Sequence, residues 1–226
     1  MMGVAYLVST WLFPVLMAVT MHEAAHGYVA WRLGDPTAKM LGRVTVNPLK
    51  HIDPVGTLLL PGLLLLIRAP FLFGFAKPVP IDFTKLNRPR RDMIWVALAG
   101  PATNFVLALA SAFLIHLAFL LPSFAESWAL QNLVNSIIIN LVLGVFNLIP
   151  LPPLDGGRVA VGILPPPWSG RLARMERHGL LILIGMIFIL PLLLAEIGVE
   201  FNLFSWLVGI PVEKLFELIT FAVGLE

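Results

Sequence analysis

The sequence predicts an all-α polytopic membrane protein. Three observations lead to this prediction: 58% of the 226 residues are hydrophobic, only 12% are charged, and the mean hydropathy is +0.91. Because soluble domains carry about 25% charged residues, this chain is too apolar to face water on every side. The sequence also contains no cysteine, which excludes disulfides and thiolate metal ligands.

The apolar residues form about five to six segments. The first segment continues as a helix through a polar cluster to Leu33, where Gly34 is suited to end the helix. The length favours a single integral-membrane domain over 1–226, with a core at 4–165 and accessory C-terminal helices at 178–225. The segments are Val4–Met21, Pro54–Phe75, Met93–Leu121, Trp128–Ile149, Gly179–Ala195 and Leu203–Gly224.

Two of these segments are not clear spans. The charge-free run within Pro54–Phe75 is Val55–Ile67, which is shorter than the ~20 residues of a spanning helix and contains a proline. We therefore predict that Pro54–Phe75 does not cross the membrane and is either re-entrant or lies on the membrane surface. Leu203–Gly224 contains charged side chains, so it either spans the membrane or lies at its interface.

A small membrane-associated β element is predicted after the first helix. Gly42–Pro48 alternates in polarity and is rich in β-branched residues, and Lys77–Phe83 has a similar extended character. We expect the edge of such an element to bind an unwound stretch of another chain by backbone pairing.

The positions of the 15 lysines and arginines predict the orientation in the membrane. Four of them lie at 32–50, six at 68–91 and four at 158–177. Because cytoplasmic loops carry the cations, we expect the amino terminus outside and these three basic regions inside. This orientation requires Pro54–Phe75 to leave the membrane on the side from which it came.

The stretch MHEAAHGYVA places two histidines and a glutamate at the end of the first apolar segment. His22 and His26 are four residues apart, so a helix brings both imidazoles to one side, where they can bind one ion. Glu23 points to the neighbouring side and can take a proton from a metal-bound water. H-E-x-x-H is the pattern of zinc hydrolases. The alternative is two interfacial histidines and a solvated glutamate, but ionisable groups in a membrane are costly and usually functional.

A catalytic zinc needs a third protein ligand. The best candidate is a carboxylate in NLIPLPPLDGG (Asn147–Gly157), where prolines keep the chain extended and two glycines beside Asp155 allow close backbone approach. Taken alone, Asp155 is more often the N-cap of a helix. The spacing of the other histidines, which are His51, His116 and His178, does not tie them to the H-E-x-x-H pair.

A third polar cluster, GPATN at Gly100–Asn104, lies early in a later span. Small residues commonly allow membrane helices to pack closely. Asn104 is more informative, because an amide side chain in lipid needs a polar partner. An interhelical hydrogen bond and a contact with a ligand are both compatible with this position.

Together these residues resemble the site-2 proteases, which are intramembrane zinc metalloproteases. Three elements match in order: H-E-x-x-H at His22–His26, G-P-x-x-N at Gly100–Asn104, and N-x-x-P-x-x-x-x-D-G at Asn147–Gly156. The match covers the core at 4–165, and the stretch NPLKHIDPVGTLL is similar to the small bacterial and archaeal branch. The length leaves no room for the PDZ or CBS domains of other members.

The resemblance also implies a set of site residues. It implies one Zn²⁺ per chain, a general base, and side chains that hold the substrate backbone or the oxyanion. It assigns no role to His51, although this residue has a place close to the site. The implied zinc ligands are His22, His26 and Asp155, the base is Glu23, and the substrate or oxyanion contacts are Asn104 and Asn147.

The function implied by the resemblance is an intramembrane zinc endopeptidase that cleaves peptide bonds in or near transmembrane segments, by Glu-assisted attack of a zinc-bound water. Its partners would be transmembrane protein substrates and the lipid bilayer, with no nucleic acid. It would be a multi-pass protein of the cell membrane with its active site near the cytoplasmic face. The alternatives are a membrane metal transporter or metal-binding protein, which would leave Glu23 unexplained, and a membrane zinc hydrolase of soluble or lipidated peptides.

Overall fold

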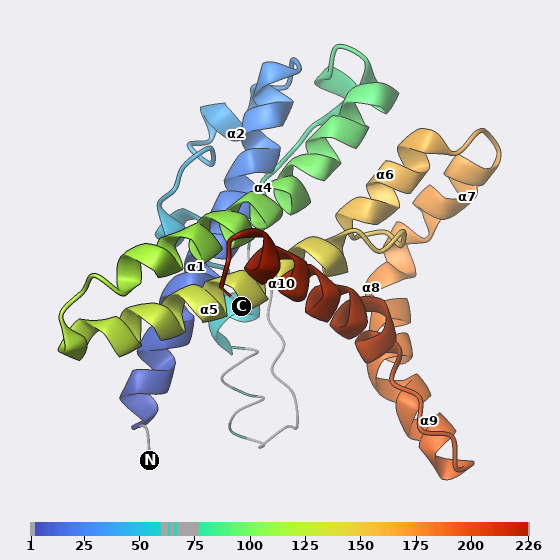
Figure 1. Ribbon diagram of the computed structural model, residues 1–226. Helices are drawn as coiled ribbons and strands as arrows, with labels where there is room; N and C mark the ends of the chain where they lie inside the picture. The colour runs from blue at the N-terminus through green and yellow to red at the C-terminus, as the bar shows by residue number, and fades with distance from the viewer. Residues whose placement is uncertain (1–2, 60–62, 64–65, 67–76, 226) are drawn as a thin grey trace.

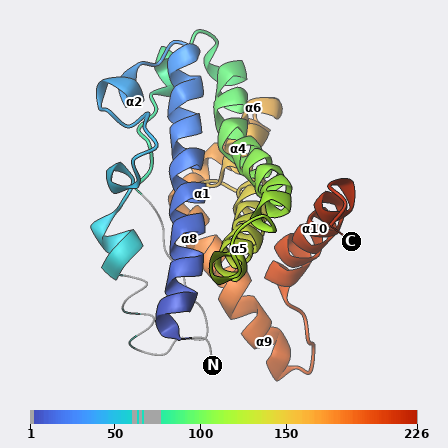
Figure 2. The ribbon, with the colours of Figure 1, turned by 60° about the vertical axis from the view of Figure 1, so that its left-hand side comes forward.

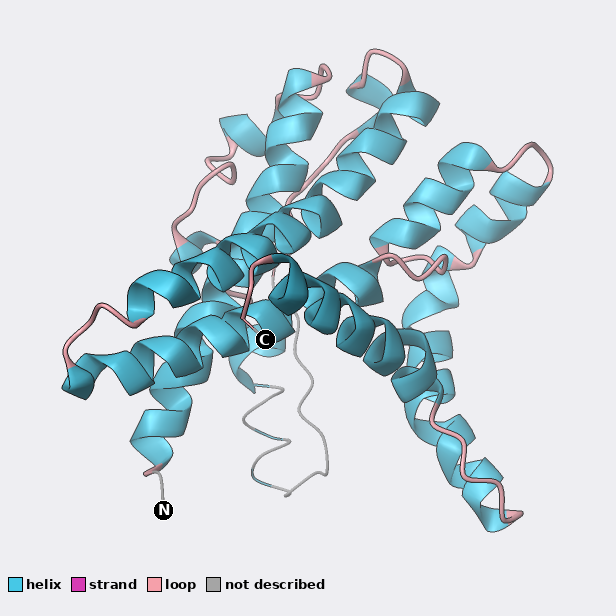
Figure 3. Ribbon diagram, in the orientation of Figure 1, coloured by secondary structure: helices cyan, strands magenta, loops and turns pink. Residues whose placement is uncertain are grey.

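The computed structural model describes residues 3–59, 63, 66 and 77–225, and all regular structure in these residues is helical (Figures 1 and 3). Four helices in this part of the chain are long and apolar enough to cross a membrane. The prediction of a helical, multi-pass membrane protein is therefore confirmed. The four candidate spans are Ala5–Arg32, Pro89–Ala118, Ser123–Asn147 and Glu176–Glu196.

The elements are named as in Figure 1, and α8, η4 and α9 form one continuous helix. The α-helices are α1 (Val4–Arg32), α2 (Thr37–Met40), α4 (Pro89–Ala118), α5 (Ser123–Asn147), α6 (Asp155–Ile163), α7 (Trp168–Arg174), α8 (Glu176–Ile184), α9 (Leu190–Glu196) and α10 (Ile210–Ala222). The short 3-10 or π elements are η1 (Pro48–Lys50), η2 (Pro54–Leu59), η3 (Phe83–Lys85), η4 (Gly185–Ile189) and η5 (Ser205–Gly209).

α1 is helical because its residues are almost all apolar, and lipid leaves the backbone no hydrogen-bond partner other than itself. The helix tolerates a buried Pro14 and ends at Arg32, with Leu33 as the C-cap. Gly34 follows with φ of 115°, a left-handed value that suits glycine. A Cβ on Gly34 would also lie 3.0 Å from Lys85 O. This glycine therefore ends α1 and lets the loop before α4 pass close to it.

α1, α4 and α5 pack against one another at the centre of the molecule (Figure 2). Small and branched side chains meet between α4 and α5, where Ala108, Ile137 and Leu141 are fully buried. α5 is joined to α1 by a hydrogen bond from Asn135 Nδ2 to Thr10 O at 2.9 Å. Small side chains allow the close approach of helices that such interhelical hydrogen bonds require.

The predicted β element is wrong: within the described residues, neither Gly42–Pro48 nor Lys77–Phe83 forms a strand (Figure 3). The two segments do lie together, but a side chain joins them, because Arg43 Nη2 donates a hydrogen bond to Lys77 O at 2.7 Å. Two prolines at alternate positions of the second segment lack an N–H. These two positions therefore supply no donors for a backbone ladder.

The two ambiguous apolar segments have different outcomes. The segment 54–75, predicted not to cross the membrane, forms η2 at its start, and most of its remainder lies outside the described residues. The segment 203–224 forms η5 and α10, which runs back across α5 (Figure 1). Leu215 and Ile219 of α10 pack on the apolar cluster between α4 and α5.

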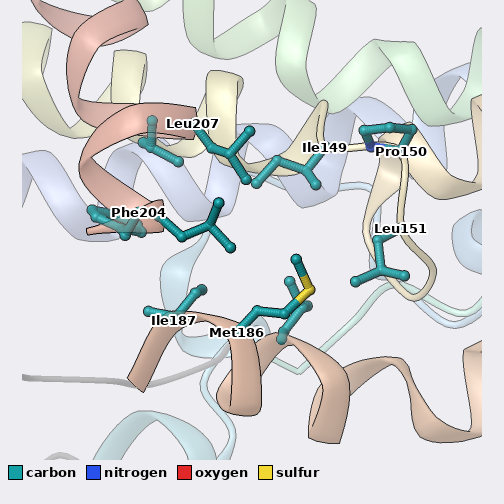
Figure 4. Close-up of a pocket in the computed structure, with 10 residues that line it drawn as sticks. Ile149, Pro150, Leu151, Met186, Ile187, Phe204 and Leu207 are labelled. Carbon is teal, nitrogen blue, oxygen red and sulfur yellow. The ribbon is translucent and has the colours of Figure 1, made fainter. Parts of the chain in front are cut away.

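The loop after α5 borders an apolar pocket of about 150 Å³ (Figure 4). Ile149 and Leu151 border it together with Met186 of η4, Leu207 of η5 and Phe204, the residue before η5. All its lining residues are apolar, so the pocket offers no group for acid–base chemistry or metal binding. The buried group of His22, His26 and Asp155 lies elsewhere, between α1, α4 and the start of α6.

Candidate active site

His22, His26 and Asp155 form one buried group, although Asp155 lies far along the chain. The Nε2 atoms of the two histidines are 3.0 Å apart, and Asp155 Oδ2 lies 3.2 Å from each of them. His22 is 7% exposed, and His26 and Asp155 are each 6% exposed. In the described part of the chain, this is the one group of three such residues that could hold a metal ion.

One face of α4 lies against the two histidines. Val96, Gly100 and Asn104 follow one another at intervals of four residues, so they share this face. His26 Nδ1 lies 2.7 Å from Val96 O, and His22 Nδ1 lies 2.6 Å from Asn104 Oδ1. A Cβ on Gly100 would lie 2.4 Å from His26 Nε2 and 2.6 Å from His22 Nε2. Glycine is therefore the residue that leaves room beside the two nitrogen atoms.

The contacts of the two Nδ1 atoms determine where each imidazole carries its proton. A carbonyl oxygen can only accept, so each neutral ring donates from Nδ1 and keeps a lone pair on Nε2. Two lone pairs then face a carboxylate oxygen, and this oxygen, Asp155 Oδ2, is buried without a hydrogen-bond partner in the described part of the chain. In this neutral form the three atoms repel one another, and a cation bound among them removes the repulsion.

The donor atoms also have the spacing that zinc requires. With bonds of about 2.0–2.1 Å, neighbouring ligand atoms of a tetrahedral zinc site lie about 3.3 Å apart. The observed separations among the three atoms are 3.0, 3.2 and 3.2 Å. Two imidazoles and one carboxylate are a ligand set that leaves a fourth position open for catalysis. The residues therefore fit a catalytic Zn²⁺.

Close backbone contacts around two glycines place Asp155. A Cβ on Gly156 would lie 2.2 Å from Leu148 O, and one on Gly157 would lie 2.1 Å from Pro152 N. The close approach that the sequence predicts for these glycines is thus confirmed. Asp155 is the first residue of α6, and Leu154 is the N-cap, with no side-chain hydrogen bond capping the helix.

The charge state of Asp155 follows from its neighbours. Burial raises the pKa of the Asp155 carboxyl, but hydrogen-bond donation and positive charge at the His22 and His26 rings outweigh burial and hold this pKa well below its usual range. A metal ion bound by the neutral rings would supply the same positive charge. The carboxyl group is therefore ionised at neutral pH. This is the form in which a carboxylate binds a metal.

Glu23 is held by a loop from a distant part of the chain. Its Oε2 accepts a hydrogen bond from the backbone N–H of Val79 at 2.8 Å. Val79 belongs to the extended segment that Arg43 also binds. Sequence reasoning missed this contact. The available signal was that Pro78 and Pro80 lack an N–H, so Val79 is the donor between them.

The two asparagines implied as substrate contacts lie in different surroundings. Asn104 is 0% exposed, and its Nδ2 donates both hydrogens, to Asn140 Oδ1 at 2.8 Å and to Ala18 O at 3.3 Å. Asn147 is half-buried at the end of α5, where its Nδ2 donates to Leu143 O at 3.0 Å. Contacts of Asn104 and Asn147 with substrate stay predictions.

The remaining histidines lie outside the metal group. His51 is buried, and its carbonyl oxygen accepts a hydrogen bond from Lys77 N at 2.9 Å, so it supports the segment that reaches Glu23. Burial lowers the pKa of the His51 imidazole. His116 Nε2 lies 2.8 Å from Val223 O, next to α10, and His178 is exposed.

Comparison with known proteins points to the same chemistry. The profile of Peptidase family M50 matches residues 115–192, a stretch that includes Asp155 but not the two histidines. The chain is 39% identical over 191 residues to "Putative zinc metalloprotease YwhC" of Bacillus subtilis (strain 168), which covers 83% of this chain and 81% of that protein. This chain belongs to the site-2 proteases, peptidase family M50.

More distant relatives have the same description. "Putative zinc metalloprotease Rip2" of Mycolicibacterium smegmatis is 34% identical over 169 residues, covering 75% of this chain and 62% of that protein. The protein of the same name from Mycobacterium tuberculosis (strain ATCC 25618 / H37Rv) is 32% identical over 203 residues, covering 90% of this chain and 71% of that protein. No solved structure matches the chain significantly.

Membership of this family decides between the classes of function considered above. This site-2 protease is a zinc metalloendopeptidase. The group that could hold its zinc is the buried set of His22, His26 and Asp155.

Proposed function

We propose that this protein hydrolyses peptide bonds in or near the transmembrane segments of other membrane proteins. The observation that supports the proposal is the position of the buried metal group on a membrane-spanning helix. With 1.5 Å per residue, His22 lies about 27 Å along α1 from Val4. The hydrocarbon core of a bilayer is about 30 Å thick. The site thus lies at membrane depth, close to one face.

Each polar residue of the group has a role in this reaction. His22, His26 and Asp155 would hold zinc, which would supply Lewis-acid chemistry for the scissile carbonyl and the attacking water. Glu23 takes the proton of the attacking water and returns it to the nitrogen of the leaving amine. The Val79 N–H holds Oε2 of this carboxylate, which leaves Oε1 to receive the proton.

The substrate must unwind locally, because a peptide bond in an intact helix is shielded by its own hydrogen bonds. The extended segment at 77–82 lies against Glu23, to which Val79 N donates a hydrogen bond. The segment is held at both ends: Arg43 donates a hydrogen bond to Lys77 O, and Asp82 N donates one to the carboxylate of Asp35 at 2.7 Å. An unwound substrate chain can lie along this segment within reach of the base.

The basic regions support an active site near the cytoplasm. The C-terminal end of α1, the N-terminal end of α4 and the turn between α6 and α7 lie at one end of the molecule, and the amino terminus lies at the other (Figure 1). The lysines and arginines of 32–50, 77–91 and 158–177 lie in or next to these parts of the chain. By the positive-inside bias, this end faces the cytoplasm, and the amino terminus is outside.

A reconstitution experiment tests the proposal. The purified protein in liposomes is given a single-span test substrate, and in parallel the same cleavable sequence as a soluble peptide. We expect Zn²⁺-dependent cleavage of the membrane-embedded substrate and little cleavage of the free peptide. Preferential cleavage of the soluble peptide would instead identify a membrane-anchored hydrolase of soluble or lipidated peptides.

A further inference from the structure

We propose that Asn140 of α5, acting through Asn104 of α4, orients His22 so that its Nε2 lone pair faces zinc. Both asparagines are positioning residues in this proposal, because the contact with the metal is made by His22. The inference rests on the proposed zinc site. It concerns how one ligand is held, which can be tested by metal binding without an assay of proteolysis.

The first step is the contact between Asn104 and His22. His22 can bind zinc through Nε2 only when its ring proton is on Nδ1, and that proton needs an acceptor. The acceptor is Asn104 Oδ1 at 2.6 Å. An amide can turn by 180° and offer its Nδ2 instead. In that orientation, Asn104 would favour the His22 tautomer that carries its proton on Nε2, and this tautomer cannot bind the metal.

The second step is the choice between the two orientations of Asn104. Its Nδ2 faces Asn140 Oδ1 at 2.8 Å and Ala18 O at 3.3 Å. The shorter contact is the one to Asn140. With its oxygen turned toward these two acceptors, the amide would lose both hydrogen bonds and face two repelling dipoles. Asn140 therefore supplies much of the preference for the orientation that suits His22.

The third step is the orientation of Asn140 itself. Its Nδ2 donates to the backbone oxygen Ser136 O at 2.9 Å and lies 3.3 Å from Ser136 Oγ. A backbone carbonyl cannot donate, so Asn140 must present Oδ1 toward Asn104. The chain of hydrogen bonds from His22 through Asn104 to Asn140 thus has one direction, set by a fixed carbonyl of α5.

Because the asparagines are buried, the direction of this hydrogen-bond chain cannot be reversed without loss. Asn104 is 0% exposed and Asn140 is 1% exposed, so water does not replace a lost partner. The three residues belong to three different helices, and α5 provides none of the residues of the metal group. In a low-dielectric interior, an unpaired amide is costly, and a fully paired network holds one arrangement. α5 thereby influences the zinc site without supplying a ligand.

Zinc affinity of the full-length protein, measured by chelator competition in detergent micelles, tests the proposal. Loss of an outer partner of a ligating histidine typically lowers metal affinity about 10–100-fold. We expect a decrease in this range for Asn104→Leu and for Asn140→Leu, with near wild-type affinity for Asn140→Asp. The aspartate keeps an acceptor for Asn104 Nδ2 and, as the neutral acid, a donor for Ser136 O. A serine at position 140 is too short to reach Asn104, so Asn140→Ser should lose zinc affinity as Asn140→Leu does. It replaces the leucine variant in the test if that variant does not fold.

Asn135→Leu is the matched control. Asn135 lies on the same helix, is also 1% exposed, and joins α5 to α1 through Thr10 O, but its hydrogen bonds go to Thr10 and Gln131 and not to Asn104. We expect this variant to lose stability and to bind zinc as the wild type does. The absorption spectrum of the Co²⁺-substituted protein should change with Asn140→Leu and not with Asn135→Leu.

Two results would overturn the inference. One is unchanged zinc affinity in folded Asn140→Leu or Asn140→Ser protein. The other is an equal loss of affinity in the Asn140 and Asn135 variants, which would indicate general destabilisation. His22→Ala separates this question from the proposed zinc site, because wild-type zinc affinity in that variant would show that His22 is not a ligand at all.

Discussion

The backbone N–H of Val79 donates a hydrogen bond to Glu23 Oε2 at 2.8 Å, which joins a loop before α4 to the residue that follows the first histidine of the metal group. This contact holds one carboxylate oxygen in place. It does not require a charge, because an amide oxygen can accept the same bond. The geometry and the basicity of Glu23 can therefore be separated by substitution.

Glu23→Gln should keep zinc and lose cleavage. The glutamine can still accept the hydrogen bond from Val79, so the fold and the metal group should be unchanged, but it cannot take a proton from water. Loss of the general base should lower kcat at least by the ~10²–10⁴-fold that such groups contribute. Metal analysis and the liposome assay on the same preparation check both parts. Substantial residual proteolysis would show that another group is the base.

Gly100→Ala should damage the metal group by direct overlap. The added Cβ would lie 2.4 Å from His26 Nε2 and 2.5 Å from His22 Cε1, so the histidines must move. We expect a fall in zinc affinity of about 10-fold or more, because ligands must be held close to their bonding geometry. Gly185→Ala is the control, since a Cβ there meets nothing within 4 Å. Equal zinc binding by both variants would contradict the close packing of α4 on the histidines.

Asp155→Ala should lower zinc affinity by more than the ~10–100-fold that follows loss of an outer-shell partner, because it removes a ligand. A residue that only capped α6 would cost about 1 kcal/mol of folding stability and leave the metal in place. Equilibrium dialysis against Zn²⁺, with circular dichroism to confirm folding, distinguishes the two roles. A folded, fully metallated variant would remove Asp155 from the ligand set.

Labelling of single cysteines should locate the two ends of the segment at 54–75. The chain has no cysteine, so Lys50→Cys and Lys85→Cys can be labelled without background. Both positions are exposed, in η1 and η3. If 54–75 is re-entrant, a membrane-impermeant thiol reagent should modify both from the cytoplasmic side only, in keeping with the charge bias. Modification from opposite sides would mean that this segment crosses the membrane.

The sequence by itself determined the features that depend on neighbouring residues. Apolar runs of sufficient length located the spans, and the four-residue interval of His22 and His26 predicted two imidazoles on one side of a helix. Gly34 marked the end of α1 to within a residue or two. These features follow from helix geometry and from the cost of burying backbone groups in lipid, which act over a few residues.

The β element shows why the same reasoning fails over longer distances. Alternating side chains describe one strand, but a strand forms only where a second backbone edge is available. The tertiary structure brought Arg43 to Lys77 O instead, and gave the Val79 N–H to Glu23. Neither partner can be deduced from the local pattern.

Only the tertiary structure decided how the metal group is held. The partners of the two histidines are Val96 O, 70 residues from His26, and Asn104 Oδ1, 82 residues from His22. The sequence marked Asn104 as a residue in need of a partner, but it could not say that the partner is a zinc-ligand candidate on one side and Asn140 on the other. The physical reason is that spacing along a helix defines a face, whereas the packing of three helices determines which face each one meets.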